Sequence, residues 1–159
     1  MGYYQVGQVC LNGHEITSNF EGQQALRAAF CSECGEATIH KCQHCDANIR
    51  GWYHVDGFIS MQEWVPPSYC HACGKPFPWI ERAVAAARDL ADEIENIEPA
   101  ELERAKQSFL ALTADTPQTA VAAARIKKLL SKAGPVVGKG IRDIVVSIAT
   151  DAAKKTIGL

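Results

Sequence analysis

Hydrophobic positions follow two different patterns along this chain. After Trp79 they recur at three- and four-residue steps, the period of an amphipathic helix. Before Trp79 they form short runs interrupted by cysteine pairs and glycines, a pattern typical of small hairpins between metal-binding turns. We therefore expect an α+β protein, with a head of small β-hairpins or sheets over residues 1–79 and an all-α region of about four short amphipathic helices over residues 80–159.

Start and stop signals divide the helical region. The first helix is expected over roughly residues 80–96 and the second from Pro99, which suits a first turn. The third is expected to have Thr116 as its cap and Pro117 at its first position, and to stop at Gly134-Pro135. Its expected apolar stripe consists of Val121, Ala124, Leu129 and Leu130. The last is expected over about residues 138–157.

The apolar stripes of these helices are rich in alanine and predict a small core. Such stripes are often completed by a partner or by a second copy of the same chain, so we expect this region to oligomerise or dock. An intramolecular bundle is the alternative. The lysines of the last helix also fit a helix lying on a membrane surface, although glycines interrupt its apolar face.

All 7 cysteines precede residue 74, and they are arranged in four short turns. Two ligands separated by two or three residues can both reach one Zn²⁺, and two such turns complete a tetrahedral site. The sequence thus predicts two structural Zn²⁺ ions per chain in tandem zinc ribbons. The predicted ligands are Cys10, His14, Cys31 and Cys34 for the first site, and Cys42, Cys45, Cys70 and Cys73 for the second.

Spacing alone leaves the pairing of these turns open. Sequential pairing is favoured because the gap between Cys34 and Cys42 resembles a linker, but a cross-braced arrangement is also compatible. His14 is chosen by position alone, and without it the first site would have three cysteines and an open coordination position. Disulfides would leave one cysteine unpaired. We expect the other histidines, His40, His44, His54 and His71, not to be ligands.

Charge is distributed unevenly along the 159 residues, whose net charge is −2. Residues 1–79 carry 4 Lys or Arg against 7 Asp or Glu, whereas residues 118–159 carry 8 against 2. The basic end could meet nucleic acid, anionic lipid or an acidic protein, or could complement the acidic segment before it. With no basic, apolar N-terminal leader and no long apolar run, we expect a cytoplasmic protein.

Aromatic residues gather in the head. Trp52, Tyr53, Phe58 and Trp64 are expected either to cover the ribbon sheets or to form a protein-facing surface. Few basic residues accompany them, which argues against stacking on single-stranded nucleic acid by this part of the chain.

Four segments resemble a bacterial family of zinc-ribbon-headed proteins described as a domain of unknown function. They are the segment 68–79 (SYCHACGKPFPW), the segment 49–55 (IRGWYHV), the start at 116–119 (TPQT) and the ending over residues 142–155. The resemblance covers most of the chain. It implies a bacterial origin and the metal ligands already given, and it implies no activity.

Taken together, these features predict a non-enzymatic zinc-binding interaction or scaffold protein. Its ribbons would present a surface to a protein partner, and its helical tail would form a homo-oligomer or dock. A nucleic-acid-binding protein that uses the basic end, or an amphipathic membrane effector, is the alternative. No phosphate-binding glycine loop, nucleophile elbow or metalloprotease motif is present, so we expect no catalytic residues.

Overall fold

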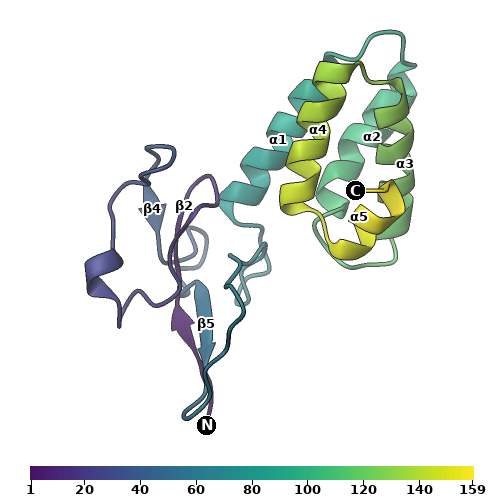
Figure 1. Cartoon of the computed structure of the whole chain (residues 1–159). Coiled ribbons are helices and arrows are strands. Elements are labelled where there is room, and N and C mark those ends of the chain that lie inside the picture. The colour runs from purple at the N-terminus through teal and green to yellow at the C-terminus, as the bar shows by residue number, and fades with distance from the viewer. The chain divides into compact units, whose positions relative to one another are not determined.

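The computed structural model describes residues 1–159 and shows two compact units, Met1–Trp79 and Ile80–Leu159 (Figure 1). The first unit holds short antiparallel strands and the second holds helices, so the predicted α+β class is confirmed. Each helix falls short of the length and hydropathy that a membrane-spanning segment requires.

Two small antiparallel sheets form the N-terminal unit. One pairs β1 (Tyr3–Val6) with β5 (Arg50–His54), and Tyr4 lies opposite Tyr53. The other has the order β3-β2-β4, built from β2 (Gln8–Cys10), β3 (Glu15–Thr17) and β4 (Thr38–Ile39). A single 3₁₀ turn, η1 (Gln24–Leu26), lies between β3 and β4. The strands are too short to be stable by themselves.

Few aliphatic side chains are buried in this unit. Val9 and Ile49 are fully buried and Val6 is 7% exposed, while the first cysteine of each Cys-x-x-Cys turn is also buried. Burying one aliphatic side chain contributes only about 1.5–3 kcal/mol. A unit of this size with so small an aliphatic core generally needs metal ions or disulfides for stability.

Five helices form the C-terminal unit: α1 (Pro78–Asp92), α2 (Pro99–Ala111), α3 (Thr119–Lys132), α4 (Pro135–Ile148) and α5 (Asp151–Ile157). Helix α3 packs against both α2 and α5. The largest fully buried side chains of the unit come from α2, the turn after it, α3 and α4, and they are Phe109, Leu112, Ile126, Leu129, Ile141 and Val145. The apolar stripes therefore meet one another within one chain.

The last predicted helix is in fact two helices. Ala149 has extended backbone angles, and the Thr150 hydroxyl accepts a hydrogen bond from the backbone N–H of Ala153, which caps α5. The backbone N–H of Thr150 also bonds to the carbonyl of Leu112 at 2.9 Å. A threonine followed by an acidic residue is a common helix start, so Thr150-Asp151 was a signal for this break.

The predictions for two other helices also need correction. Helix α3 begins at Thr119 and not at Pro117, and the Thr116 hydroxyl accepts from the N–H of Gln118 in the turn that precedes the helix. Of the predicted stripe of α3, Leu129 and Leu130 are buried as expected, whereas Val121 and Ala124 are exposed. Ala122, Ala123 and Ile126, one or two positions further along, are buried in their place. Helix α1 ends at Asp92, a few residues earlier than predicted.

Candidate metal centres

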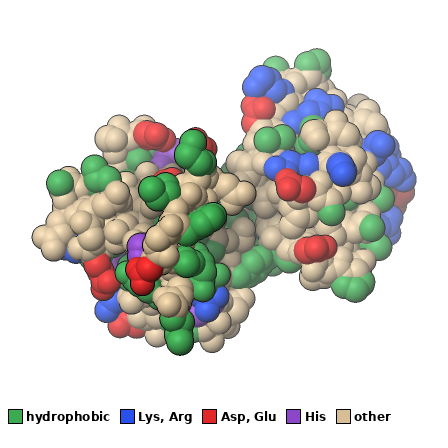
Figure 2. Space-filling view, turned by 60° about the horizontal axis from the view of Figure 1, so that its bottom comes forward, with side chains coloured by type: hydrophobic (Ala, Val, Ile, Leu, Met, Phe, Trp, Pro, Cys, Tyr) green, Lys and Arg blue, Asp and Glu red, His purple; other side chains and the backbone are tan.

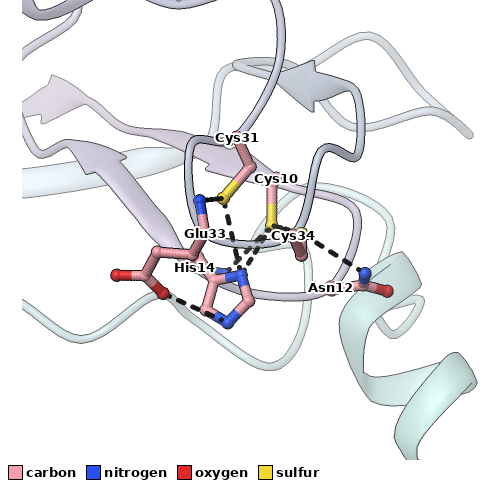
Figure 3. Close-up of polar contacts among 6 residues, drawn as sticks. All are labelled: Cys10, Asn12, His14, Cys31, Glu33 and Cys34. Atoms are coloured by element: carbon pink, nitrogen blue, oxygen red, sulfur yellow. Dashed lines mark hydrogen bonds and ion pairs between the residues drawn. The ribbon is translucent and has the colours of Figure 1, made fainter.

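Cys10, His14, Cys31 and Cys34 converge at one end of the three-stranded sheet (Figure 3). Cys10 ends β2 and His14 precedes β3, so the hairpin turn carries both. The Sγ of Cys10 lies 3.8 Å from the Sγ of Cys34 and 3.4 Å from Nδ1 of His14, and the Sγ of Cys31 lies 3.5 Å from the same nitrogen.

Cys42, Cys45, Cys70 and Cys73 form a second group, so the turns pair sequentially. The Sγ atoms of Cys42 and Cys73 are 3.8 Å apart, and those of Cys45 and Cys70 are 3.6 Å apart. In each group all four ligand atoms lie within 4.8 Å of one another. The structure thus brings together all eight residues that the sequence selected, in two groups of four.

These distances fit a tetrahedral metal site. With a metal–sulfur distance of about 2.3 Å and a metal–nitrogen distance of about 2.0 Å, tetrahedral geometry places sulfurs about 3.8 Å apart and sulfur and nitrogen about 3.5 Å apart. A disulfide needs about 2.05 Å between sulfurs. The observed separations of 3.4–3.8 Å between neighbouring ligand atoms therefore match shared coordination of an ion.

The three Cys-x-x-Cys turns have the same local structure. In each, the backbone N–H two residues after the first cysteine points at its sulfur, at 3.4–3.5 Å. The N–H four residues after it bonds to its carbonyl at 2.8–2.9 Å, and that residue has a positive φ: Gly35 (75°), Asp46 (65°) and Gly74 (74°). Glycine adopts this conformation without strain, so Asp46 stands where glycine is preferred.

Hydrogen bonds from backbone N–H groups lower the pKa of these thiols, whereas burial raises it. The backbone N–H of Glu36 and then the Asn12 amide lower the pKa of Cys34 to about 6. Burial raises the pKa of Cys70, but the backbone N–H groups of Cys73 and Ala72 outweigh it and lower that pKa to about 7.

The pKa of Cys45, in the same group as Cys70, is shifted in the opposite direction. The backbone N–H of Ala47 lowers the pKa of this thiol, but burial and three neighbouring thiols outweigh that bond and raise the pKa to about 12. Thiols this close cannot all ionise unless a cation lies among them, which is the situation that a metal ion creates.

Glu33 and Asn12 support the first site and were not selected from the sequence. Nε2 of His14 lies 3.3 Å from a carboxylate oxygen of Glu33, on the side of the ring away from the cysteines (Figure 3). The Asn12 side-chain N–H donates to the Sγ of Cys34 at 3.5 Å. A carboxylate on the distal nitrogen holds a ligating imidazole in one tautomer and orientation. Glu33 lies inside a turn, where sequence patterns do not distinguish a supporting residue from a solvated one.

The remaining histidines lie outside both groups. His40 stacks on Phe20 with ring centroids 4.0 Å apart, and its pKa is lowered chiefly by burial. Nε2 of His54 lies 3.1 Å from Oδ1 of Asp56. His44 and His71 are exposed within their turns.

The fold and the two sites define a chain with two candidate metal centres in a β head, followed by a helical unit. A family model described as uncharacterized protein conserved in bacteria (DUF2321) matches residues 3–157, and the chain belongs to this family. The resemblance expected from the sequence is thereby confirmed. Neither a curated protein nor a solved structure shows significant similarity to the chain.

Proposed function

We propose that this protein is a non-enzymatic interaction protein of the cytoplasm, in which two structural Zn²⁺ ions hold a partner-binding surface in shape. One observation supports this most strongly. The 24 residues between Cys45 and Cys70 contain β5 and nearly all of the residues around an exposed aromatic hollow. The second metal centre therefore holds both ends of the segment that carries this surface.

The ligand sets favour a structural role for the metals. Each group supplies four protein ligands, and a closed tetrahedral site leaves no coordination position for a substrate. Thiolate and imidazole ligands in tetrahedral geometry are typical of zinc. The metals then contribute to folding and to the shape of the head, and recognition depends on the surface that they hold.

The helical unit supports the interaction role less directly. Its apolar stripes pack against one another, so docking or self-association by this unit would use its outer surface. The same packing argues against membrane binding through the last helices. Their apolar side chains are buried inside the unit, namely Ile141, Val145, Ile148 and Ile157. Exposing them to lipid would require the unit to open.

Nucleic-acid binding by the basic end is a second candidate. Part of that charge is paired, since Lys128 and Lys132 lie 3.4 and 2.7 Å from the carboxylate of Glu101. Arg125, Lys127 and Arg142 are exposed and form no ion pair within the unit. A gel shift at low and high salt tests this candidate, and absence of binding at low salt would eliminate it.

The proposed function is tested in the native host with a tagged full-length chain. Proteins that co-purify with the wild type should be lost from a variant in which Cys70 and Cys73 are both serine. They should be retained by a variant with lysine in place of the exposed Glu21. A wild-type chain that recovers no protein reproducibly, or a partner retained by the serine variant, would contradict the proposal.

A further inference from the structure

The N-terminal unit has an open hollow of about 600 Å³ beside β5. Five aromatic side chains surround it, namely Tyr4, Trp52, Tyr53, Phe58 and Trp64. Figure 2 shows hydrophobic side chains gathered on one face of this unit. The volume lies within the range of ligand-binding sites, about 300–1,000 Å³.

The rim of this hollow stays largely exposed. Phe58 is 70% exposed and Val65 77%, and the neighbouring Ile59 and Met61 are 88% and 97% exposed. Contiguous apolar exposure of this kind is typical of surfaces that a macromolecular partner covers. A small molecule would leave most of these side chains in water.

One wall of the hollow is fixed by glycines. A Cβ placed on Gly7 would lie 2.6 Å from the ring of Trp64, and Cα of Gly51 lies 3.3 Å from the same point. The indole ring thus packs against bare backbone at the β1–β5 sheet. Together with the metal centre that closes residues 46–69, this contact gives the hollow a defined shape before a partner arrives.

Charge around the hollow indicates which partner would fit. Glu63 is the one carboxylate among its lining residues, is exposed, and forms no ion pair. The one basic lining residue, Arg50, already lies over the ring of Tyr4, 4.4 Å from its centroid. With 4 basic against 7 acidic residues, the whole unit also favours a cation over a phosphate backbone.

We propose that this hollow binds a peptide segment of a partner protein in which an apolar side chain lies next to a lysine or arginine. The apolar side chain would pack among Trp52, Phe58 and Trp64. The basic side chain would extend along the aromatic faces and place its charge at Glu63, where cation–π and ionic attraction act together. This inference rests on the proposed function and specifies the chemistry of the partner.

A display selection tests the proposal on the full-length, zinc-loaded protein. A random twelve-residue peptide library is selected on the wild type and, in parallel, on Phe58→Ser, which alters an exposed side chain and should leave the fold intact. The wild type should enrich peptides with an aromatic or aliphatic residue within two positions of Lys or Arg. Enrichment of acidic or wholly polar peptides, of the same peptides on Phe58→Ser, or of no consensus, would overturn it.

Affinity measurements with a selected peptide then test the role of Glu63. By fluorescence anisotropy, Glu63→Lys should weaken binding at least about tenfold, whereas Glu21→Lys makes the same charge change outside the hollow and should have little effect. Equal effects of the two substitutions would overturn the placement of the charge. If the selection fails while the native complex is still recovered with the tagged chain, the peptide chemistry is wrong and the interaction role stands.

Discussion

Removing the metal ligands of the fourth turn, Cys70 and Cys73, should make the segment that carries the aromatic hollow flexible. In a variant with Cys70→Ser and Cys73→Ser, the second centre keeps only Cys42 and Cys45 and can no longer join the two ends of the segment. The 24 residues between Cys45 and Cys70 are then no longer closed into a loop by the metal centre. The chain-entropy relation for a cross-linked loop of this length gives a decrease of about 3.5 kcal/mol in the free energy of unfolding.

This loss is large compared with the packing that remains in the segment. Ile49 is the single fully buried aliphatic side chain within it, and burial of one such side chain contributes about 1.5–3 kcal/mol. The pairing of β5 with β1, and the hydrogen bond from the N–H of Trp52 to the carbonyl of Ser18 at 3.0 Å, should therefore become transient. Hydrogen exchange of peptides covering residues 50–54 measures this directly.

The matched control is Cys31→Ser with Cys34→Ser, which removes the equivalent turn of the first centre. Native mass spectrometry should show one metal ion in each variant and two in the wild type. Protection of residues 50–54 should fall in the first variant and stay close to wild type in the control. Equal loss of protection in both variants, or retention of two ions after loss of the fourth turn, would refute the argument that the second centre holds this segment.

Four further substitutions test the local chemistry. His14→Ala should reduce the metal count from two to one by mass spectrometry, and Glu33→Gln should weaken metal affinity at the first centre about 10–100-fold in a chelator competition, without changing the second. Asp46→Gly should stabilise the head by about 0.5–1 kcal/mol in chemical denaturation, because the positive φ of Asp46 (65°) suits glycine; unchanged or lower stability would count against strain at that turn. The pKa of Glu101 is lowered, chiefly by its hydrogen bond to Lys132, so its contribution to stability is present above its ordinary value of 4.5 and is lost as pH falls through the lowered pKa. Glu101→Gln should therefore lower the melting midpoint of the helices at neutral pH and flatten its decline in acid, and a parallel shift at every pH would contradict this.

The spacing of cysteines carried most of the information about the head. A pair of ligands in a tight turn has little freedom in where it points, so the metal-binding turns were predictable from sequence alone. The spacings of the ligands are compatible with two pairings, but the linker-like gap between Cys34 and Cys42 favoured sequential pairing. The structure confirms it by joining Cys10 with Cys31 and Cys42 with Cys70. Glu33 could not be selected, since its role depends on the orientation of the His14 ring.

The helical unit shows where periodic patterns lose precision. The class and order of its elements followed from three- and four-residue steps, but alanine-rich stripes leave the buried face ambiguous by one or two positions. For that reason Val121 and Ala124 were assigned to the apolar stripe of α3 together with Leu129 and Leu130, whereas the structure buries Ala122, Ala123 and Ile126 beside those two leucines. The break at Ala149 had a local signal, Thr150 followed by Asp151, and the N–H of Thr150 also bonds to the carbonyl of Leu112, which is far away in sequence.

The hollow beside β5 was anticipated only as a group of aromatic residues. The sequence left open whether Trp52, Tyr53, Phe58 and Trp64 cover a sheet or face outward. Their arrangement depends on the register of β1 against β5 and on the approach of Trp64 to the backbone at Gly7. Neither feature has a local signature in the sequence.

The metal content of the full-length chain, purified without added metal, tests the central claim most directly. Native mass spectrometry, with elemental analysis of the same sample, should show two zinc ions per chain. Removing them with a chelator should lower the hydrogen-exchange protection of residues 50–54, while the helices of residues 80–159 stay protected. A chain that carries no metal, or one in which chelation leaves the head unchanged, would contradict the account.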